Sequence, residues 1–418
     1  MNRREFFLTT TGGVLAASLS GLSGASAAPA KEVTIGAIWP MSGSSAEIGV
    51  QARHAIETAL DIVNNVHKID LPLAKSAGLP NLGGAKVRVL YADHQGDPEK
   101  GRAEAERLIT QNNVCTLMGA YHSAVSATVS ATCERYSIPY LCADSSAPDL
   151  SQHGLKFFFR PSPTDEMFST AMFDFLDSLK KQGKSIKTIA LFYEDTIFGI
   201  DSSKAQRDLA KQRGYKVVAD VKYKSNSPSL TSEVQELKNA NADVLMPSSY
   251  TTDAILLVKT MSELGYKPKS ILAQAAGFSD QMLYDAVGDK LNRVISRGSF
   301  SLDLGSKRPS VLAVNKLFKA RSGADLDDNT SRQFMGLLIA ADAINRAKST
   351  DGKKIRGALA ATNIPGDRTI MPWRKVTFDA QGQNEFADPV LLQYVSGHFK
   401  TIFPAGIAIA KPIWPMNG

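Results

Sequence analysis

Three serines stand where an apolar, strand-like run passes into a helical run, a position at which serine can bind an anion. Ser123 follows the run 114–118 and begins a helical pattern, whereas Ser145 and Ser146 follow the run 138–142. The first turn of a helix leaves backbone N–H groups unpaired, and these groups with a serine hydroxyl form a natural binding place for a carboxylate or phosphate. Serine in this position also serves as a plain helix cap, so both interpretations stay open.

Aromatic side chains lie at similar places along the chain. Tyr121 and His122 directly precede Ser123, Phe198 lies in a later loop, and Tyr250 follows the apolar run 244–246. Aromatic residues in loops at the carboxyl ends of strands commonly line ligand crevices, although each of these could instead fill the core. No second metal ligand stands at helical spacing from His122, so we predict no metal site.

The motifs of common enzymes are missing from the sequence. It contains no G-x-S-x-G, no H-E-x-x-H and no paired C-x-x-C. The segment 96–102 spaces its glycines like a phosphate-binding loop but lacks the following Lys-Ser/Thr, and Asp97-Pro98 explains it better as the start of a helix. Adjacent residues such as His122 and Ser123 seldom point at one another as base and nucleophile. We therefore expect no catalytic residues, no cofactor and no enzymatic activity.

The first 28 residues have the composition of an export signal. Arg3-Arg4 precede a weakly apolar stretch rich in Thr, Gly, Ala and Ser that ends in small residues before Pro29. The uncharged stretch is long enough for a membrane anchor, but its composition makes a poor hydrocarbon helix. No cysteine precedes Cys115, which excludes a lipid-modified cysteine at the cleavage site. We expect a twin-arginine signal peptide over 1–28 and a mature protein in the periplasm, without stable membrane insertion.

Length and composition indicate a globular protein of two domains. The chain has 418 residues, of which 43% are hydrophobic and 21% charged, and its formal net charge is +7. The basic residues are scattered rather than clustered, so we expect no nucleic acid partner. The three cysteines are odd in number and lie in or beside apolar segments, which predicts buried thiols rather than disulfides.

Strand-like runs alternate with amphipathic helical runs through most of the chain, the pattern of βα units around a parallel sheet. We predict strands over 33–38, 86–92, 114–118, 138–142, 187–193, 216–223, 243–247 and 270–274. Between the halves, the segment 160–163 places two prolines next to Arg160 and predicts a crossing between compact domains.

These features together resemble the extracytoplasmic receptors of branched-chain amino acid ABC importers. The similarity runs from about Val33 to about Phe386, and each fragment is weak alone, whereas their order and spacing are specific. The fragments are Ile35-Gly36 with Pro40-Met41-Ser42-Gly43, Asp93 with Asp97-Pro98, Met118-Gly119 through Ser123, 145–150, 157–160, Phe198-Gly199, Ser249-Tyr250 and 378–382.

The resemblance implies an α/β fold of the type I periplasmic binding class, in which two Rossmann-like lobes are joined by three hinge crossings. We place the crossings near 160, 298 and 371. Lobe 1 is then 31–159 plus 298–370, and lobe 2 is 160–297 plus 371–418. The connection 66–84 is longer than the family average, and its role is not readable from the sequence.

The resemblance also implies a ligand site between the lobes. The family holds a ligand carboxylate at the places matched by Ser123 and Ser146. We expect the site to be lined by these residues together with Ile48, Tyr121, His122, Asp144, Ser145, Phe198, Tyr250, Ala276 and Gly277. Ile48 stands where several members carry an aromatic residue, so that wall should be aliphatic.

The residue at 276 limits the choice of ligand. Amino-acid-binding members place an acid for the ammonium group at the position of Ala276. A buried ammonium without a charge partner costs several kcal/mol, unless Asp144, Glu194 or Asp195 supplies the charge. We therefore expect a small carboxylate, hydrophobic or aromatic, that is captured by closure of the lobes and delivered to the permease subunits of an ABC importer. A branched-chain or hydrophobic amino acid, an amide or urea, and a role as a ligand sensor stay as alternatives.

Overall fold

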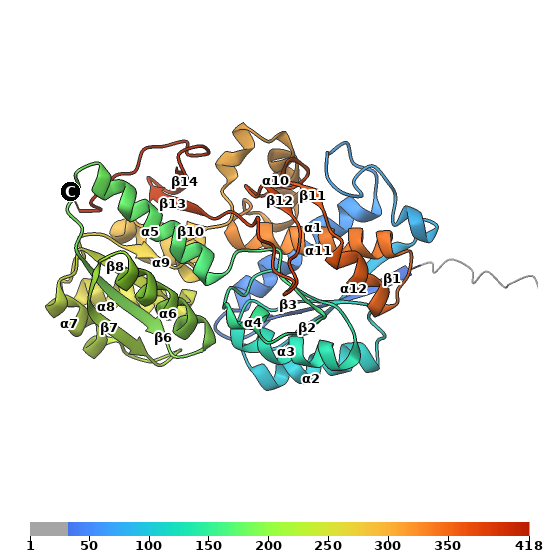
Figure 1. Ribbon diagram of the computed structural model, residues 1–418, viewed down its shortest axis with the longest axis horizontal. Helices are drawn as coiled ribbons and strands as arrows, with labels where there is room; N and C mark the ends of the chain where they lie inside the picture. Colours follow the sequence, from blue (N-terminus) through green and yellow to red (C-terminus); the bar gives the residue numbers. More distant parts are fainter. Residues whose placement is uncertain (1–31, 418) are drawn as a thin grey trace, which may run out of the picture.

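The computed structural model describes residues 32–417, and the expected signal peptide lies outside them. Figure 1 shows two α/β lobes side by side, one built mainly from the first part of the chain and the other mainly from the middle part. None of the helices within 32–417 combines the length and the apolar character needed to cross a bilayer.

Lobe 1 contains a five-stranded parallel sheet in the order β2-β1-β3-β4-β5. Its strands are β1 (Glu32–Trp39), β2 (Lys86–Asp93), β3 (Leu117–Gly119), β4 (Tyr140–Cys142) and β5 (Phe158–Phe159). The central strands read as nearly continuous apolar runs because helices cover both faces of the sheet.

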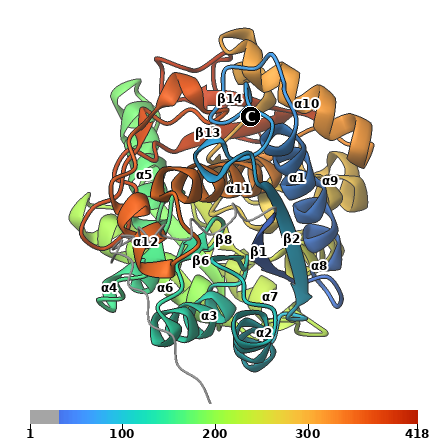
Figure 2. The same cartoon turned by 90° about the vertical axis from the view of Figure 1, so that its right-hand side faces the viewer.

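The helices of lobe 1 form two layers around this sheet. Helices α2 (Pro98–Thr110) and α3 (Ser123–Tyr136) pack together on one face, and α1 (Ala46–Asn64) and α11 (Asp328–Ala347) pack together on the other (Figure 2). The lobe also holds α4 (Asp149–Gln152), α10 (Pro309–Ser322), α12 (Gly352–Ala360) and the antiparallel pair β11 (Ile364–Pro365) and β12 (Lys375–Val376).

Lobe 2 is built on three parallel strands, β7-β6-β8, which two isolated bridges, Leu245–Ile271 and Ser249–Ala276, join to a four-stranded sheet, β9-β10-β13-β14. The strands are β6 (Thr188–Glu194), β7 (Lys216–Tyr223), β8 (Val244–Ser248), β9 (Leu272–Ala273), β10 (Ile295–Gly298), β13 (Val390–Val395) and β14 (His398–Phe403). The helices are α5 (Asp165–Lys181), α6 (Ile197–Gln212), α7 (Thr231–Ala240), α8 (Thr251–Glu263) and α9 (Gln281–Val287).

The chain passes between the lobes three times. It leaves lobe 1 after β5, returns after β10, and leaves again between β12 and β13. Because β12 still pairs with β11 of lobe 1 and β13 pairs with β10 of lobe 2, we propose that the third crossing lies between 376 and 390 rather than near 371.

Three predicted strands are shorter in the structure than in the sequence pattern. The runs 138–142 and 270–274 contain β4 and β9, of three and two residues, and the run 114–118 overlaps β3, which has three residues and ends at Gly119. Backbone turns limit β9, since Ala275 and Ala276 have φ of 55° and 50°. The connection 66–84 packs Leu71, Ala74 and Leu79 into the core of lobe 1, so it forms part of that lobe's wall.

The cysteines are buried and free, as the sequence predicted. Cys115, Cys133 and Cys142 form no disulfide within residues 32–417. Burial raises the pKa of each thiol, in Cys115 to about 12, because the charged thiolate is disfavoured away from water.

We therefore expect the folded protein to be inert toward a thiol reagent such as Ellman's reagent at neutral pH. After unfolding in guanidinium chloride, three thiols per chain should react, because the sequence holds three cysteines. A thiol that reacts in the folded protein, or fewer than three in the unfolded one, would contradict the burial or the free state of these residues.

Candidate functional site

The residues expected at the ligand site lie at the carboxyl ends of strands, where the two lobes meet. Tyr121, His122 and Ser123 follow β3, and the segment 144–146 follows β4. On the lobe 2 side, Phe198 opens α6 after β6, Tyr250 precedes α8 after β8, and Ala276-Gly277 follow β9. This is the edge of an α/β sheet at which ligands generally bind.

A cluster of aromatic rings closes the seam between the lobes. The ring of Tyr250 in lobe 2 lies 5.3 Å from that of Tyr121 and 4.8 Å from that of His122, both in lobe 1. Phe198 adds a contact at 5.2 Å from Tyr250 within lobe 2. The hydroxyl of Thr252 also donates a hydrogen bond of 3.1 Å to the carbonyl of Ser44 across the seam. The lobes are therefore in direct contact on this side.

Ser123 places a buried hydroxyl at the start of α3. Its side chain is 1% exposed, and its Oγ has no hydrogen-bond partner within residues 32–417. We call a buried side-chain N or O atom without a hydrogen-bond partner in this part of the chain an open atom. The residue before it, His122, makes no side-chain cap to the helix, and the phenol of Tyr250 faces the backbone of Ser123. The Ser123 hydroxyl is therefore open, whereas the backbone at the helix start already faces the phenol of Tyr250.

Ser145 and Ser146 lie near Ser123 but differ in what their side chains do. The hydroxyl of Ser145 lies 2.7 Å from that of Ser126 and donates to the carbonyl of Tyr121 at 3.0 Å, so it ties the loops after β3 and β4 together. The hydroxyl of Ser146 instead faces Arg297 at 3.5 Å. Of the two, Ser146 is the one oriented toward the seam.

The imidazoles near the site are neutral. Nε2 of His94 donates to the carbonyl of Ala120 at 2.9 Å, and Nε2 of His122 lies 3.3 Å from the hydroxyl of Ser45. Burial lowers the pKa of His94 to about 4 and that of His122 to about 3, because the imidazolium would lose its hydration. In the described chain, no group of His, Cys, Asp or Glu side chains could hold a metal ion.

Of the three acids considered as substitutes at position 276, only Asp144 keeps an open oxygen. Glu194 accepts from the backbone of Gly199 at 2.8 Å, and Asp195 accepts from that of Ser225 at 2.9 Å. One oxygen of Asp144 accepts from Trp39 at 3.2 Å and from Gln333 at 2.8 Å, while the other is open. Burial raises the pKa of Asp144.

Ala276 and Gly277 bring backbone rather than charge to the seam. Ala276 forms a single bridge with Ser249, and a Cβ on Gly277 would lie 2.7 Å from the backbone of Thr251, so no larger residue fits at 277. Ile48 is buried in the same apolar cluster as Tyr121, Phe198, Tyr250 and Ala276. Ile48 thus adds an aliphatic side chain to a cluster that also contains aromatic rings.

The chain matches the family model described as periplasmic binding protein over residues 32–397. The chain belongs to the periplasmic binding proteins. It is 31% identical over 392 residues to a Leu/Ile/Val-binding protein homolog of Brucella abortus, which covers 91% of this chain and 92% of that protein. The chain is thus a type I solute-binding protein of the branched-chain amino acid ABC importer class, as its sequence predicted.

Solved structures share the fold of this binding protein at low identity. A leucine binding protein of Thermotoga maritima aligns with a TM-score of 0.74 and 19% identity over 88% of this chain and 97% of that chain. A solute-binding protein of R. palustris in complex with benzoate aligns with a TM-score of 0.75 and 15% identity over 93% and 99% of the two chains. These similarities confirm the predicted α/β fold class.

The binding protein also holds a buried charge network that the sequence did not reveal. It consists of Arg297 at the end of β10, Arg332 and Asp328 in α11, Asp165 at the start of α5, and Asp144. We call it the crossing network, because Asp165 and Arg297 lie beside the first two passages between the lobes. The one signal in the sequence was an arginine inside the short buried strand that precedes the second crossing.

The imidazole of His122 gives a pH-dependent contribution to stability. Its pKa is lower in the folded protein, about 3, than the ordinary value of about 6.5, so the unfolded chain binds more protons between these values. Stability is therefore lost as the pH falls from 7 to 5. In a His122→Gln variant this loss should shrink by about 2 kcal/mol, at about 1.4 kcal/mol per pKa unit.

Urea unfolding at pH 7 and pH 5 measures this difference. The variant His153→Gln, at an exposed position, is the control. An equal loss of unfolding free energy in His122→Gln and in the unmodified protein would show that His122 does not stay neutral in the fold.

Proposed function

We propose that this protein captures a small carboxylate, hydrophobic or aromatic, between its lobes and presents it to the permease of an ABC importer. The observation that supports this most directly is the open hydroxyl of Ser123 at the start of α3, beside the aromatic cluster at the seam. A buried hydroxyl without a partner costs about 1–3 kcal/mol, and a ligand carboxylate would remove this cost. The protein would act by binding alone, without chemistry on its ligand.

The aromatic rings at the seam favour an apolar ligand body. Tyr121 and Phe198 are 5% and 3% exposed, and both contact Tyr250. A ring of the ligand among them would gain about 0.5–1.5 kcal/mol beyond the burial of its area. Since Tyr250 belongs to lobe 2 and Tyr121 to lobe 1, a ligand held between them would couple binding to closure.

An amino acid is the second candidate for the ligand of this protein. Structures with this fold hold isoleucine in one case and benzoate in another. The open oxygen of Asp144 favours an amino acid, whereas Ala276 favours an acid without an amine. We propose the acid, because Asp144 is already engaged by Trp39 and Gln333. Periplasmic location, export through the signal peptide and delivery rather than sensing belong to the same proposal.

Replacing Ser123 by Ala should weaken binding of an acid by about ten- to a hundredfold, because a hydrogen bond to a charged group contributes roughly 1.5–3 kcal/mol. The acid is chosen by a thermal-shift screen of benzoate, 3-phenylpropionate and 4-methylpentanoate, and its dissociation constant is measured by calorimetry.

The matched control is Ser130→Ala, on the same helix. Ser130 is also buried, but its hydroxyl donates to the carbonyl of Ala127, so its loss should leave the dissociation constant unchanged. If the screen finds no acid that binds, or if Ser123→Ala binds the acid as tightly as the parent, the carboxylate assignment at α3 is wrong.

A second test compares acids with the matching amino acids, such as 3-phenylpropionate with phenylalanine. Apolar burial nearly cancels within the pair, so the difference reports on the ammonium group. Without an acid at 276, that group should cost at least about 1–3 kcal/mol, or roughly five- to a hundredfold in affinity. Tighter binding of phenylalanine would contradict the proposal, and loss of that preference in Asp144→Ala would identify Asp144 as the substitute.

A further inference from the structure

Three arginines are fully buried near the seam, and they differ in how their donors are used. Arg160, Arg297 and Arg332 are 0%, 2% and 3% exposed. A buried guanidinium is destabilising unless its five N–H groups are bonded to oxygen atoms. Comparing the hydrogen bonds of the three therefore identifies the arginine that has N–H donors left for a partner from outside the chain.

Arg160 and Arg332 have their donors well bonded within their surroundings. Arg160 donates to the side chains of Gln383 and Ser151 and to the carbonyls of Ser145 and Ala147, at 2.6–3.2 Å. Arg332 donates to both the carbonyl and the carboxylate of Asp328, to Asn329 and to the carbonyl of Asp144, at 2.6–3.0 Å. Both arginines hold parts of the fold together.

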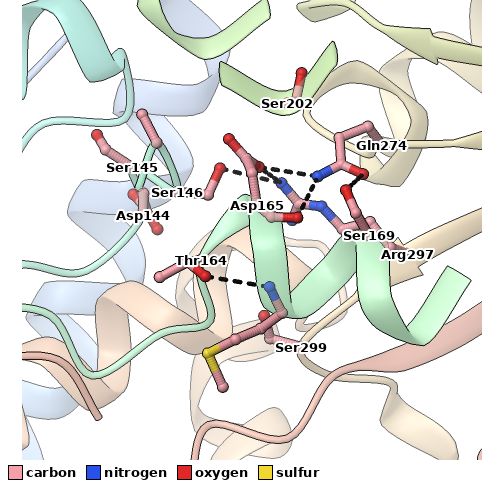
Figure 3. A network of polar contacts seen from close by, with 12 residues as sticks. Asp144, Ser145, Ser146, Thr164, Asp165, Ser169, Ser202, Gln274, Arg297 and Ser299 are labelled. Atoms are coloured by element: carbon pink, nitrogen blue, oxygen red, sulfur yellow. Dashed lines mark hydrogen bonds and ion pairs between the residues drawn. The ribbon is translucent and has the colours of Figure 1, made fainter. Parts of the chain in front are cut away.

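Arg297 is bonded far less well. Its Nε and Nη1 are open atoms, and its one hydrogen bond, to the hydroxyl of Ser146, is 3.5 Å long. Its nitrogens lie 3.9 Å from the carboxylate of Asp165 and 3.7 Å from that of Asp328, too far for direct hydrogen bonds. The ring of Phe168 covers one face of the guanidinium at 3.7 Å. Figure 3 shows Arg297 with Ser146 and Asp165 close to it.

The open donors of Arg297 belong to the same seam as the open hydroxyl of Ser123. Ser146 and Asp144 follow β4, and the phenol of Tyr121 follows β3 and lies within the electrostatic reach of both Arg297 and Arg332. The phenol oxygen of Tyr121 is itself an open atom. Burial lowers the pKa of Arg297 to about 10, so it remains a cation at neutral pH. A full positive charge with two unused donors thus lies within electrostatic reach of one open hydroxyl of lobe 1, that of Tyr121.

We propose that Arg297 is the residue that selects for an anionic ligand, by donating hydrogen bonds from one of its two open N–H groups, Nε or Nη1, and from the neighbouring Nη2 to the ligand's carboxylate. This deepens the proposed function and rests on it. Nε with Nη2, or Nη1 with Nη2, presents parallel donors that match the two oxygens of a carboxylate, which a serine hydroxyl cannot do. Because Arg297 belongs to β10 of lobe 2 and Ser146 to lobe 1, a carboxylate bound by both would connect the lobes.

A competing attraction comes from the carboxylates of the network. Asp165 has an open Oδ2, although its Oδ1 accepts from Gln274 at 3.0 Å. An amine on the ligand would be drawn to that oxygen rather than to Arg297. The geometry favours the acid, since Arg297 offers two open donors and the open oxygen of Asp165 offers one acceptor on a residue already bonded to Gln274.

The test uses one apolar body with three head groups: 3-phenylpropionate, 3-phenylpropionamide and 3-phenylpropylamine. Calorimetry gives the dissociation constant of each for the full mature protein and for Arg297→Gln and Arg297→Lys. We expect the unmodified protein to bind the acid at least tenfold tighter than the amide. In Arg297→Gln that ratio should fall by about ten- to a hundredfold, and Arg297→Lys should keep part of it because the charge is retained.

The matched control is Arg332→Gln, which removes an equally buried guanidinium of the same network. Its donors are already bonded, so the acid-to-amide ratio should stay as in the unmodified protein even if the melting temperature falls. A purely structural role of Arg297 would weaken binding of acid and amide by the same factor. The Lys and Gln variants at 297 decide the question even if Arg332→Gln does not fold.

The outcomes separate the two proposals. If the unmodified protein binds none of the acids, the carboxylate function is overturned, and the role of Arg297 with it. If it prefers the acid and Arg297→Gln keeps that preference, only the role of Arg297 is overturned. Tighter binding of the amine than of the acid would overturn it as well and would place the ligand's charge at Asp165.

Discussion

The buried charges of the crossing network constrain where the two lobes can sit. Arg332 is bonded to Asp328 within α11 and to the carbonyl of Asp144 after β4, and Arg297 lies between Asp165 and Asp328. Removing one partner from such a network leaves a buried charge uncompensated, at a cost of about 3–5 kcal/mol. The starts of α5 and α11 and the end of β10 are therefore held near one another, and the strand ends of both lobes face the same seam.

The parallel sheets then decide which residues meet there. In each lobe the carboxyl ends of the parallel strands point to one edge, so loops that are far apart in sequence lie together. This is why Ser123 after β3 and Ser146 after β4 lie at the same seam as Tyr250 after β8. The aromatic contacts of Tyr250 with Tyr121 and His122 depend on that arrangement, since neither lobe alone contains the cluster.

The sequence was sufficient for most of the parallel strands and for the places of the candidate residues at strand ends, because strand runs, helix starts and loop aromatics are local features. It was not sufficient for Arg297, since an arginine in the short strand β10 acquires meaning only when the crossings bring Asp165 and Ser146 beside it. The pairing of β12 with β11, on which the proposed place of the third crossing rests, is also not visible in either two-residue strand. The hydroxyl of Ser145 is a similar case, because its contact with Ser126 joins the loop after β4 to helix α3.

Ligand selectivity in the proposed site depends on hydrogen-bond and charge partners that the chain does not supply as well as on those that it does. Ala276 supplies no carboxylate at its position, so an ammonium held there would have to find its charge partner in Asp144 or Asp165. Arg297 is a cation with two open donors, and a neutral amide would bring it neither a negative charge nor a second acceptor oxygen. Each feature alone would favour the acid over one competing ligand. In the proposed function, Ala276 would lower the affinity for the amino acid and Arg297 would lower the affinity for the amide, while the aromatic cluster would bind the apolar body that all three ligands share.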